Sequence, residues 1–321
     1  MNITGIHSIV YGCEDLEAAG RFLLDLGFEA SAEDSADDSA SASYDLADGT
    51  SVVLRSIDDE SLPASMVDGD TARELIWRVE SADVLRKIAV EFSTDRNVRQ
   101  TPDGVLHVVD DLGYALGFKV AEAKSIELAP PLTNTLGNRR RRNSRADGTE
   151  ARIPKLLRTA HVGCWAPGDV DRNKAFYVDR LGFRETDYVK NMGVFLRAQG
   201  STEHHDIFLS RRGERRGFQH VAYEVRDFDE VMFLGNHLEA QGWQTHFGPG
   251  RHIFGSNIFW YFWNPAGGLL EITADLDCVD DQWEMRYHET LPKGAGTWLA
   301  RPIDQRRIPF RTREEDSVII E

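Results

Sequence analysis

The amino-acid sequence repeats itself, and this internal repeat limits the possible folds more than any other feature. Residues 5–30 and 159–186 share one order: a short β-type run, a turn with acidic residues, an amphipathic helix, and then Leu-Gly-Phe. The two segments read GIHSIVYGCEDLEAAGRFLLDLGFEA and TAHVGCWAPGDVDRNKAFYVDRLGFRET. A chain that carries such a unit twice is expected to build two related halves.

The repeat continues beyond these two segments. Residues 74–92 match residues 220–242 as a strand followed by a helix. Residues 108–120 match residues 262–274 as a turn that leads into a strand. Alternating polar and apolar residues between these segments, as in TSVVLRS and DIFLSRR, are typical of further strands.

Four strand–helix–strand–strand–strand units account for the length of the chain. We therefore predict an α+β fold of four βαβββ modules, paired into two domains over residues 1–123 and 158–321. Residues 124–157 are rich in Pro, Asn, Gly and Arg and lack apolar periodicity, which predicts a linker. The polar segment from about residue 275 is predicted to wrap over the second domain.

Composition excludes several classes of partner. The chain has 37 Lys and Arg against 53 Asp and Glu, a net charge of −16, whereas a nucleic-acid grip needs a clustered basic face. The Arg139–Arg142 run is therefore interpreted as part of a solvated linker that pairs with acidic surfaces. No apolar run approaches the roughly 18 residues of a membrane span. With three scattered cysteines (Cys13, Cys164 and Cys278), we expect a cytoplasmic protein in a reducing compartment.

Three residues at comparable strand positions of the second half carry metal-binding side chains. His161 and His220 lie in the first strands of two successive units, and Glu271 lies in a last strand. A single strand histidine is usually a satisfied core or interface residue, so neither histidine is informative alone. Glu271 sits in an otherwise apolar strand, where an unpartnered carboxylate would be costly. Two imidazoles and one carboxylate form a facial triad that suits Fe(II) or Mn(II).

The first half serves as an internal control for this interpretation. Aligned by the repeat, His7 lies opposite His161, Glu74 opposite His220 and Gly117 opposite Glu271. Two of the three candidate ligands are therefore replaced in the first half. A purely structural role for the triad should appear in both halves. We therefore predict one metal site per chain, in the second half.

The second half of the sequence resembles the type I extradiol ring-cleaving dioxygenases of the vicinal oxygen chelate superfamily. The resemblance is weak over residues 1–122 and strong over residues 158–274. It is carried by EHHDIFLSRRGERRGFQHVAYEV and GPGRHIFGSNIFWYFWNPAGGLLEIT. Two-domain members of that family have a metal-free N-terminal domain and an active C-terminal domain. The resemblance implies Fe(II)-dependent (meta) cleavage of a substituted catechol by O2 in aromatic-compound degradation, and a homo-oligomer.

The resemblance also implies roles for individual residues. By it, the triad holds iron (Mn(II) being acceptable to the same ligands), and His205 matches the family's acid–base histidine. His252 and Tyr261 match its two residues that hydrogen-bond the substrate. His204 competes with His205 for the acid–base role. We favour His205 because the following strand would place Ile207 on the same face.

The remaining histidines receive plainer interpretations. We expect surface positions for His237 and His288 and a structural role for His107. For His246 the sequence favours two positions equally, one at the pocket entrance and one in a solvated loop.

Aromatic residues near the end of the second half favour a hydrophobic substituted catechol, with Phe247, Trp243 and His246 as candidates for its pocket. Phe247 lies five residues before His252, where relatives that prefer carboxylates tend to carry arginine, although other arginines could substitute. Two alternative functions stay open. One is another metal-dependent enzyme of the same fold, such as a lyase, isomerase or thiol transferase, and the other is a non-catalytic ligand-binding protein.

Overall fold

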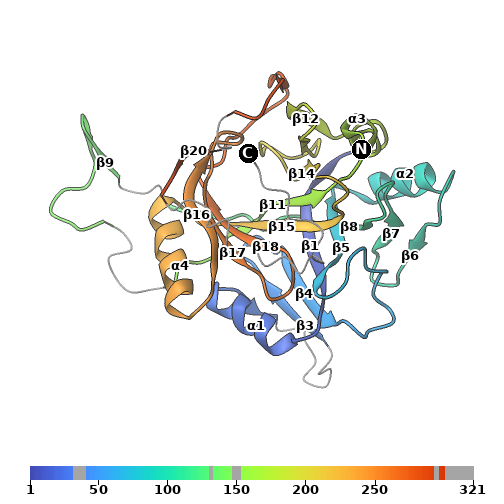
Figure 1. Ribbon diagram of the computed structural model, residues 1–321, viewed down its shortest axis with the longest axis horizontal. Coiled ribbons are helices and arrows are strands. Elements are labelled where there is room, and N and C mark those ends of the chain that lie inside the picture. Colours follow the sequence, from blue (N-terminus) through green and yellow to red (C-terminus); the bar gives the residue numbers. More distant parts are fainter. Residues whose placement is uncertain (32–40, 130–132, 147–152, 293–295, 301–321) are drawn as a thin grey trace.

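Four consecutive modules, each with one strand, one helix and three further strands, make up most of the described chain (Figure 1). The computed structural model describes residues 1–31, 41–129, 133–146, 153–292 and 296–300. The first half contains β1 (Ile3–Cys13), α1 (Leu16–Asp25), β2 (Glu29–Ala30), β3 (Ser41–Asp45), β4 (Ser51–Ser56), β5 (Thr71–Val79), α2 (Ala82–Phe92), β6 (Arg99–Gln100), β7 (Leu106–Val109) and β8 (Ala115–Val120).

The second half repeats this order. It contains β11 (Arg158–Trp165), α3 (Val170–Ala175), a π-helical turn η1 (Phe176–Arg180), β12 (Arg184–Val189), β13 (Gly193–Arg197), β14 (Ile207–Ser210), β15 (Gly217–Glu224), α4 (Phe228–Ala240), β16 (Thr245–His252), β17 (Ile258–Trp263) and β18 (Leu269–Ala274). The α+β class and the four βαβββ modules predicted from the repeat are confirmed.

Each half forms one mixed sheet with the same pairing scheme. The strand order is β2-β3-β4-β1-β5-β8-β7-β6 in the first sheet, and β12-β13-β14-β11-β15-β18-β17-β16 forms the equivalent part of the second. The first strand of each module pairs in parallel with the last strand of that module. The first strands of two successive modules pair antiparallel. The strands β11, β15 and β18 are therefore direct neighbours at the centre of the second sheet.

The Leu-Gly-Phe repeat ends the first helical segment of each half in the same way. Asp15 caps α1 by accepting a hydrogen bond from a backbone amide of the first turn, and Asp169 caps α3 likewise. Gly27 and Gly182 follow these helical segments with φ of 93° and 78°. A residue with a Cβ adopts this left-handed conformation only at a cost, so glycine terminates the helix without strain.

The two halves share one continuous hydrophobic core. Trp77 of β5 meets Phe183 of the second half edge to face, with ring centroids 5.1 Å apart. Phe28 meets Tyr223 of β15 in the same way at 5.0 Å. Because such aromatic pairs bury large apolar areas, they fix one half against the other.

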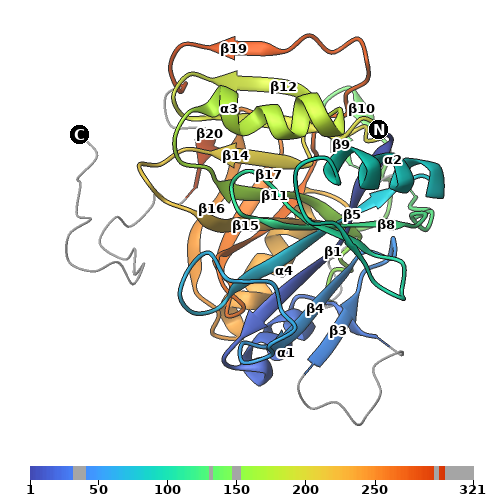
Figure 2. The same cartoon turned by 90° about the vertical axis from the view of Figure 1, so that its right-hand side faces the viewer.

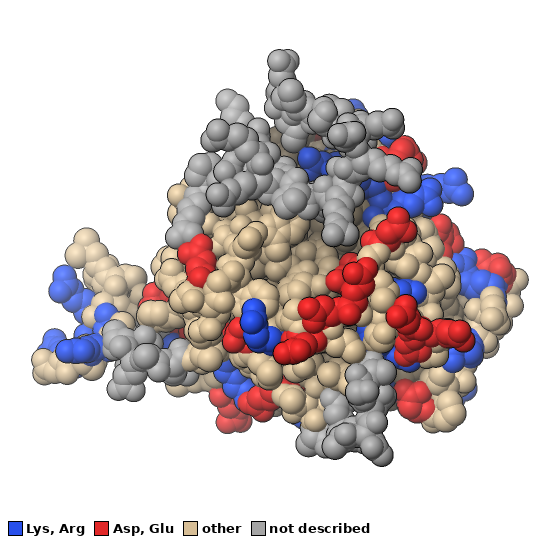
Figure 3. Space-filling view, turned by 60° about the horizontal axis from the view of Figure 1, so that its bottom comes forward, with Lys and Arg blue, Asp and Glu red and all other residues tan. Residues whose placement is uncertain are grey.

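The C-terminal segment extends both edges of the second sheet. The strand β19 (Arg286–His288) pairs in parallel with β12, as Figure 2 shows, and β20 (Gly296–Leu299) pairs with β16. The linker carries an exposed hairpin of β9 (Asn134–Thr135) and β10 (Asn138–Arg139), and Figure 3 shows Lys and Arg on this projection. Among the described residues, no helix is long and apolar enough to span a membrane.

Candidate metal centre and cavity

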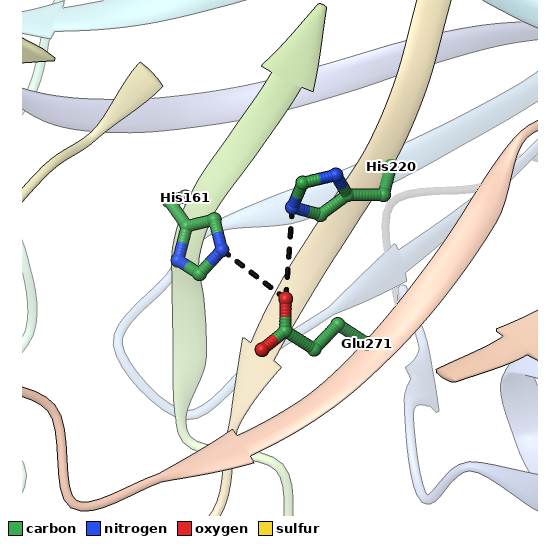
Figure 4. A group of neighbouring side chains, drawn as sticks. All are labelled: His161, His220 and Glu271. Atoms are coloured by element: carbon green, nitrogen blue, oxygen red, sulfur yellow. Dashed lines mark hydrogen bonds and ion pairs between the residues drawn. The ribbon is translucent and has the colours of Figure 1, made fainter. Parts of the chain in front are cut away.

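Three adjacent strands bring His161, His220 and Glu271 together (Figure 4). Ala222 of β15 faces His161 on β11 and Glu271 on β18, so strand register alone places these two side chains in one row. The Oε2 atom of Glu271 lies 3.3 Å from Nε2 of His161 and 3.6 Å from Nε2 of His220. All candidate ligand atoms lie within 4.8 Å of one another, and all three residues are buried.

The donor set fits a metal ion. His220 Nδ1 hydrogen-bonds Gln219 Oε1 at 3.0 Å, and because that oxygen only accepts, the ring proton sits on Nδ1. The lone pair of His220 Nε2 then points toward Glu271, and this buried nitrogen has no hydrogen-bond partner within the described chain. Such an orphaned acceptor is costly unless a cation takes it. The site therefore suits a divalent ion with two neutral imidazoles and one carboxylate.

The electrostatics of His220 and Glu271 support the same protonation states for these two residues. Burial and the neighbouring His161 lower the pKa of His220 to about 3, so its imidazole is neutral at pH 7. Burial by itself raises the pKa of Glu271, but His161, His252 and His220 outweigh it and bring that pKa to about 2. The site thus offers one negative charge, buried and surrounded by imidazoles.

Two further residues hold the Glu271 carboxylate in place. The Tyr261 hydroxyl donates to Oε2 at 2.5 Å, and the Asn257 side-chain amide donates to Oε1 at 2.7 Å. His252 Nε2 lies 3.2 Å from the Tyr261 hydroxyl. Sequence reasoning did not identify Asn257. It follows a turn at the start of β17 and is fully buried, and its only sequence signal is a polar residue before the apolar run IFWYFW.

His205 lies beside the His161 ring at the same centre. Its ring centroid lies 4.1 Å from that of His161, and the residue is 3% exposed. Burial and the neighbouring imidazoles, His161 first, hold the pKa of His205 well below its usual range. His204 is also buried, but it points away from the triad and contacts Asp187 instead.

Among its described residues, the first half has no equivalent donor set. Ile76 faces Ser8 and Gly117, just as Ala222 faces His161 and Glu271. The register therefore places Ser8, and not His7, at the His161 position, which corrects the alignment made from sequence. The cause is turn length: seven positions separate Ser8 from the capping Asp15, whereas eight separate His161 from Asp169.

A hydrogen-bonded pair occupies the corresponding place in the first half. Glu74, the counterpart of His220, lies 2.6 Å from Nδ1 of His107. Thr101 contacts the other ring nitrogen of His107 at 3.2 Å. The two groups satisfy each other, so this half holds a polar pair in place of a donor set with an orphaned nitrogen.

A cavity of about 500 Å³ opens onto His161 and His220 of the triad. Its wall is largely apolar and aromatic, and the Phe247 ring stacks on Tyr261 with centroids 4.5 Å apart. His246 also lines this cavity, together with Arg211 and Arg212. The lining includes His161, His205, His220, His252 and Tyr261.

Trp243 does not lie in the cavity, which corrects its assignment to the pocket. Its indole packs against Phe22 of α1 with centroids 4.8 Å apart, under the guanidinium of Arg21. The indole N–H donates to Asp25 at 2.8 Å. Trp243 thus joins the two halves, because its place just beyond α4 directs it toward α1.

Gly163 is expected to be essential for the position of His220. A Cβ at this residue would lie 2.3 Å from His220 Nδ1 and 2.5 Å from Gln219 Oε1. Because both atoms must move, Gly163→Ala should lower metal affinity by about 10- to 100-fold, the usual effect of disturbing the partners of a metal ligand. Metal retained after dialysis against graded chelator measures the change.

The matched control is Gly117→Ala in the first half. A Cβ there would lie 2.8 Å from Ile76 Cγ1, so it disturbs packing on the strand equivalent to β18. This variant should lose stability in thermal unfolding but keep full metal affinity. Equal metal affinity in both variants would contradict the role assigned to Gly163.

Comparison with known proteins shows what the second half resembles. Residues 158–272 match the model of the Glyoxalase/Bleomycin resistance protein/Dioxygenase superfamily. The chain is 34% identical over 127 residues to metapyrocatechase 2 of Cupriavidus necator, which is 40% of this chain and 38% of that protein. It spans about two fifths of the length of the curated relatives that it matches.

Solved structures with the same fold cover nearly the whole chain. A Mn(II)-bound glyoxalase from Novosphingobium aromaticivorans is 24% identical, with a TM-score of 0.70 over 94% of this chain and 95% of that one. A halotolerant catechol dioxygenase is 14% identical, with a TM-score of 0.71 over 95% and 96%. At these identities the likeness establishes the two-domain vicinal oxygen chelate fold.

Proposed function

We infer from the superfamily domain at residues 158–272 and from the centre within it that the protein is a metal-dependent extradiol dioxygenase. It opens the ring of a substituted catechol, next to the two hydroxyl-bearing carbons, with both atoms of O2 entering the product. One observation carries this proposal: a largely apolar cavity is lined by His161 and His220 of the donor set, by a separate buried histidine, and by a tyrosine–histidine pair.

The three donors are proposed to hold Fe(II), with Mn(II) as the alternative. Two imidazoles and one carboxylate leave coordination positions open, and this arrangement is typical of oxygen-activating iron sites. The chemistry supplied by a bound ion is Lewis-acid activation of a catechol hydroxyl and the assembly of catechol and O2 in reactive geometry.

The chain's own residues do the remaining work. The neutral imidazole of His205 can take a proton from the catechol and return one to the reacting oxygen, as a positioned general acid–base group. Tyr261 and His252 are hydrogen-bonded to each other and border the cavity, so they can hold a catechol oxygen as its proton leaves. The aromatic wall keeps bulk water away from these groups, which strengthens each hydrogen bond.

The apolar wall favours a catechol with a hydrophobic substituent. Trp165, Phe195, Phe208 and Phe254 line the cavity along with Phe247. Arg211 and Arg212 also border it, so catechols with a carboxylate substituent belong in the same substrate panel. We expect higher kcat/KM for alkyl- and aryl-substituted catechols.

Oxygen uptake by metal-loaded protein tests the proposal. Protein loaded anaerobically with Fe(II) receives a catechol and is then exposed to air. We expect a yellow ring-opened product and one O2 consumed per product formed. Protein loaded with Zn(II), which has no redox chemistry, is the matched control and should give neither.

The same experiment separates the alternatives. Catechol binding without oxygen uptake in Fe(II)- and Mn(II)-loaded protein would reject ring cleavage and favour a non-catalytic binding protein. Substrate conversion without oxygen uptake would favour a lyase or isomerase of the same fold.

A further inference from the structure

A hydrogen-bonded chain of four side chains runs from the edge of the second sheet to the cavity. Asp187 of β12 is 2% exposed, and each of its carboxylate oxygens contacts a different histidine. Oδ2 lies 2.7 Å from His204 Nε2, and Oδ1 lies 2.6 Å from His288 Nε2. His204 Nδ1 in turn lies 3.0 Å from His205 Nδ1. The order is His288–Asp187–His204–His205.

This order determines where the ring protons lie. A carboxylate only accepts hydrogen bonds, so His204 donates its Nε2–H to Asp187. When His204 is neutral, its Nδ1 is an acceptor, and the 3.0 Å contact with His205 then requires that His205 donates its Nδ1–H. The lone pair of His205 is consequently on Nε2.

His288 is what the C-terminal segment adds to this chain. It lies on β19, whose parallel pairing with β12 sets Val189 opposite His288. Its side chain is 25% exposed, and its ring packs against Phe254 of the cavity wall with centroids 5.1 Å apart. The sequence predicts only a surface position for His288, whereas in the structure its side chain also contacts a buried carboxylate. By donating to the second oxygen of Asp187, it fixes the plane of the carboxylate that His204 meets.

We propose that Asp187, His204 and His288 are positioning residues that hold His205 as the Nδ1–H tautomer, with its Nε2 lone pair available in the cavity. The kinetic part of this proposal rests on the proposed ring cleavage. The structural part does not. Without Asp187 as an acceptor, His204 can turn to its other tautomer and donate from Nδ1, which forces the proton of His205 onto Nε2.

Nitrogen-15 NMR of the metal-free protein, labelled in histidine, tests the structural part directly. Long-range proton–nitrogen correlations report which ring nitrogen carries the proton, and His205→Asn assigns the signals of His205. In the parent protein we expect Nδ1–H. In Asp187→Leu, which has a similar size but no acceptor atom, we expect loss of that tautomer. A parent spectrum with the His205 proton on Nε2 would overturn the proposal even if no variant folds.

Kinetics of the metal-loaded protein test the consequence. For Asp187→Leu and His204→Phe, kcat for ring cleavage should fall by about 10- to 100-fold, as for other partners that orient a functional histidine. KM for the catechol and the metal content should stay near the parent values. His288→Asn should have a smaller effect in the same direction, because Asp187 keeps its contact with His204.

Tyr287→Phe is the matched control, since it changes the same strand next to His288 without touching Asp187. It should leave both the tautomer and kcat unchanged. An unchanged His205 tautomer and kcat in Asp187→Leu would overturn the proposal, as would a loss of kcat that appears equally in Tyr287→Phe. A parent protein that cleaves no catechol would reject the proposed function instead, and the NMR result would still decide the tautomer.

Discussion

Removing the Glu271 carboxylate is expected to abolish metal binding, whereas removing Glu74 should leave one metal ion per chain. Glu271 supplies the only carboxylate of the donor set, and its Oε2 atom faces both candidate histidines. Losing a ligand should cost more than the roughly 10- to 100-fold that disturbing its partners costs. Glu74 occupies the His220 position of the first half and is the carboxylate nearest to a matching site there, but it is paired with His107. Metal analysis of anaerobically purified Glu271→Ala and Glu74→Ala measures the difference.

The imidazole ligands should behave like Glu271. We expect His161→Ala and His220→Ala to lose the metal as well, while thermal unfolding of the metal-free proteins shows that the fold persists. Two metal ions per chain, or full metal content in Glu271→Ala, would contradict the assignment of a single site to the second half.

Replacing His205 is expected to separate chemistry from binding. The residue lies beside His161 but is not needed to complete the donor set, so His205→Asn should retain its metal and its anaerobic affinity for catechol. Ring cleavage should fall by about 10²- to 10⁴-fold, the range for loss of a positioned acid–base group. Metal analysis, anaerobic titration with catechol and single-turnover kinetics provide the three readouts.

His246 offers the matched control for this experiment. It lines the same cavity, but its ring contacts Phe247 and Trp263, away from the donor set. His246→Asn should therefore change substrate preference more than the rate of cleavage. If His205→Asn kept its metal and cleaved catechol at the parent rate, the acid–base role would return to His204. Loss of metal in His205→Asn would instead make His205 a ligand.

The sequence by itself determined the modules and the identity of the metal-site candidates. Strand alternation, helix periodicity and the Leu-Gly-Phe repeat each span only a few residues. They can therefore be recognised in the sequence without knowledge of long-range contacts. The repeat also assigned His161, His220 and Glu271 to equivalent strands of the modules. Such strands lie near one another in one sheet, so the three side chains were expected to lie close together. The same alignment showed that Glu74 and Gly117 replace two of the three candidate ligands in the first half.

Only the tertiary structure decided the features that depend on register and docking. The segment from His161 to the capping Asp169 is one residue longer than the segment from Ser8 to the capping Asp15. Ser8, and not His7, is therefore the structural counterpart of His161. Trp243 turns to α1, and His288 reaches Asp187 because β19 adds to the edge of the sheet beside β12. These contacts join residues far apart in the chain. A shift of one position in a strand reverses the face of every side chain, and no local pattern records which distant surface a segment will meet.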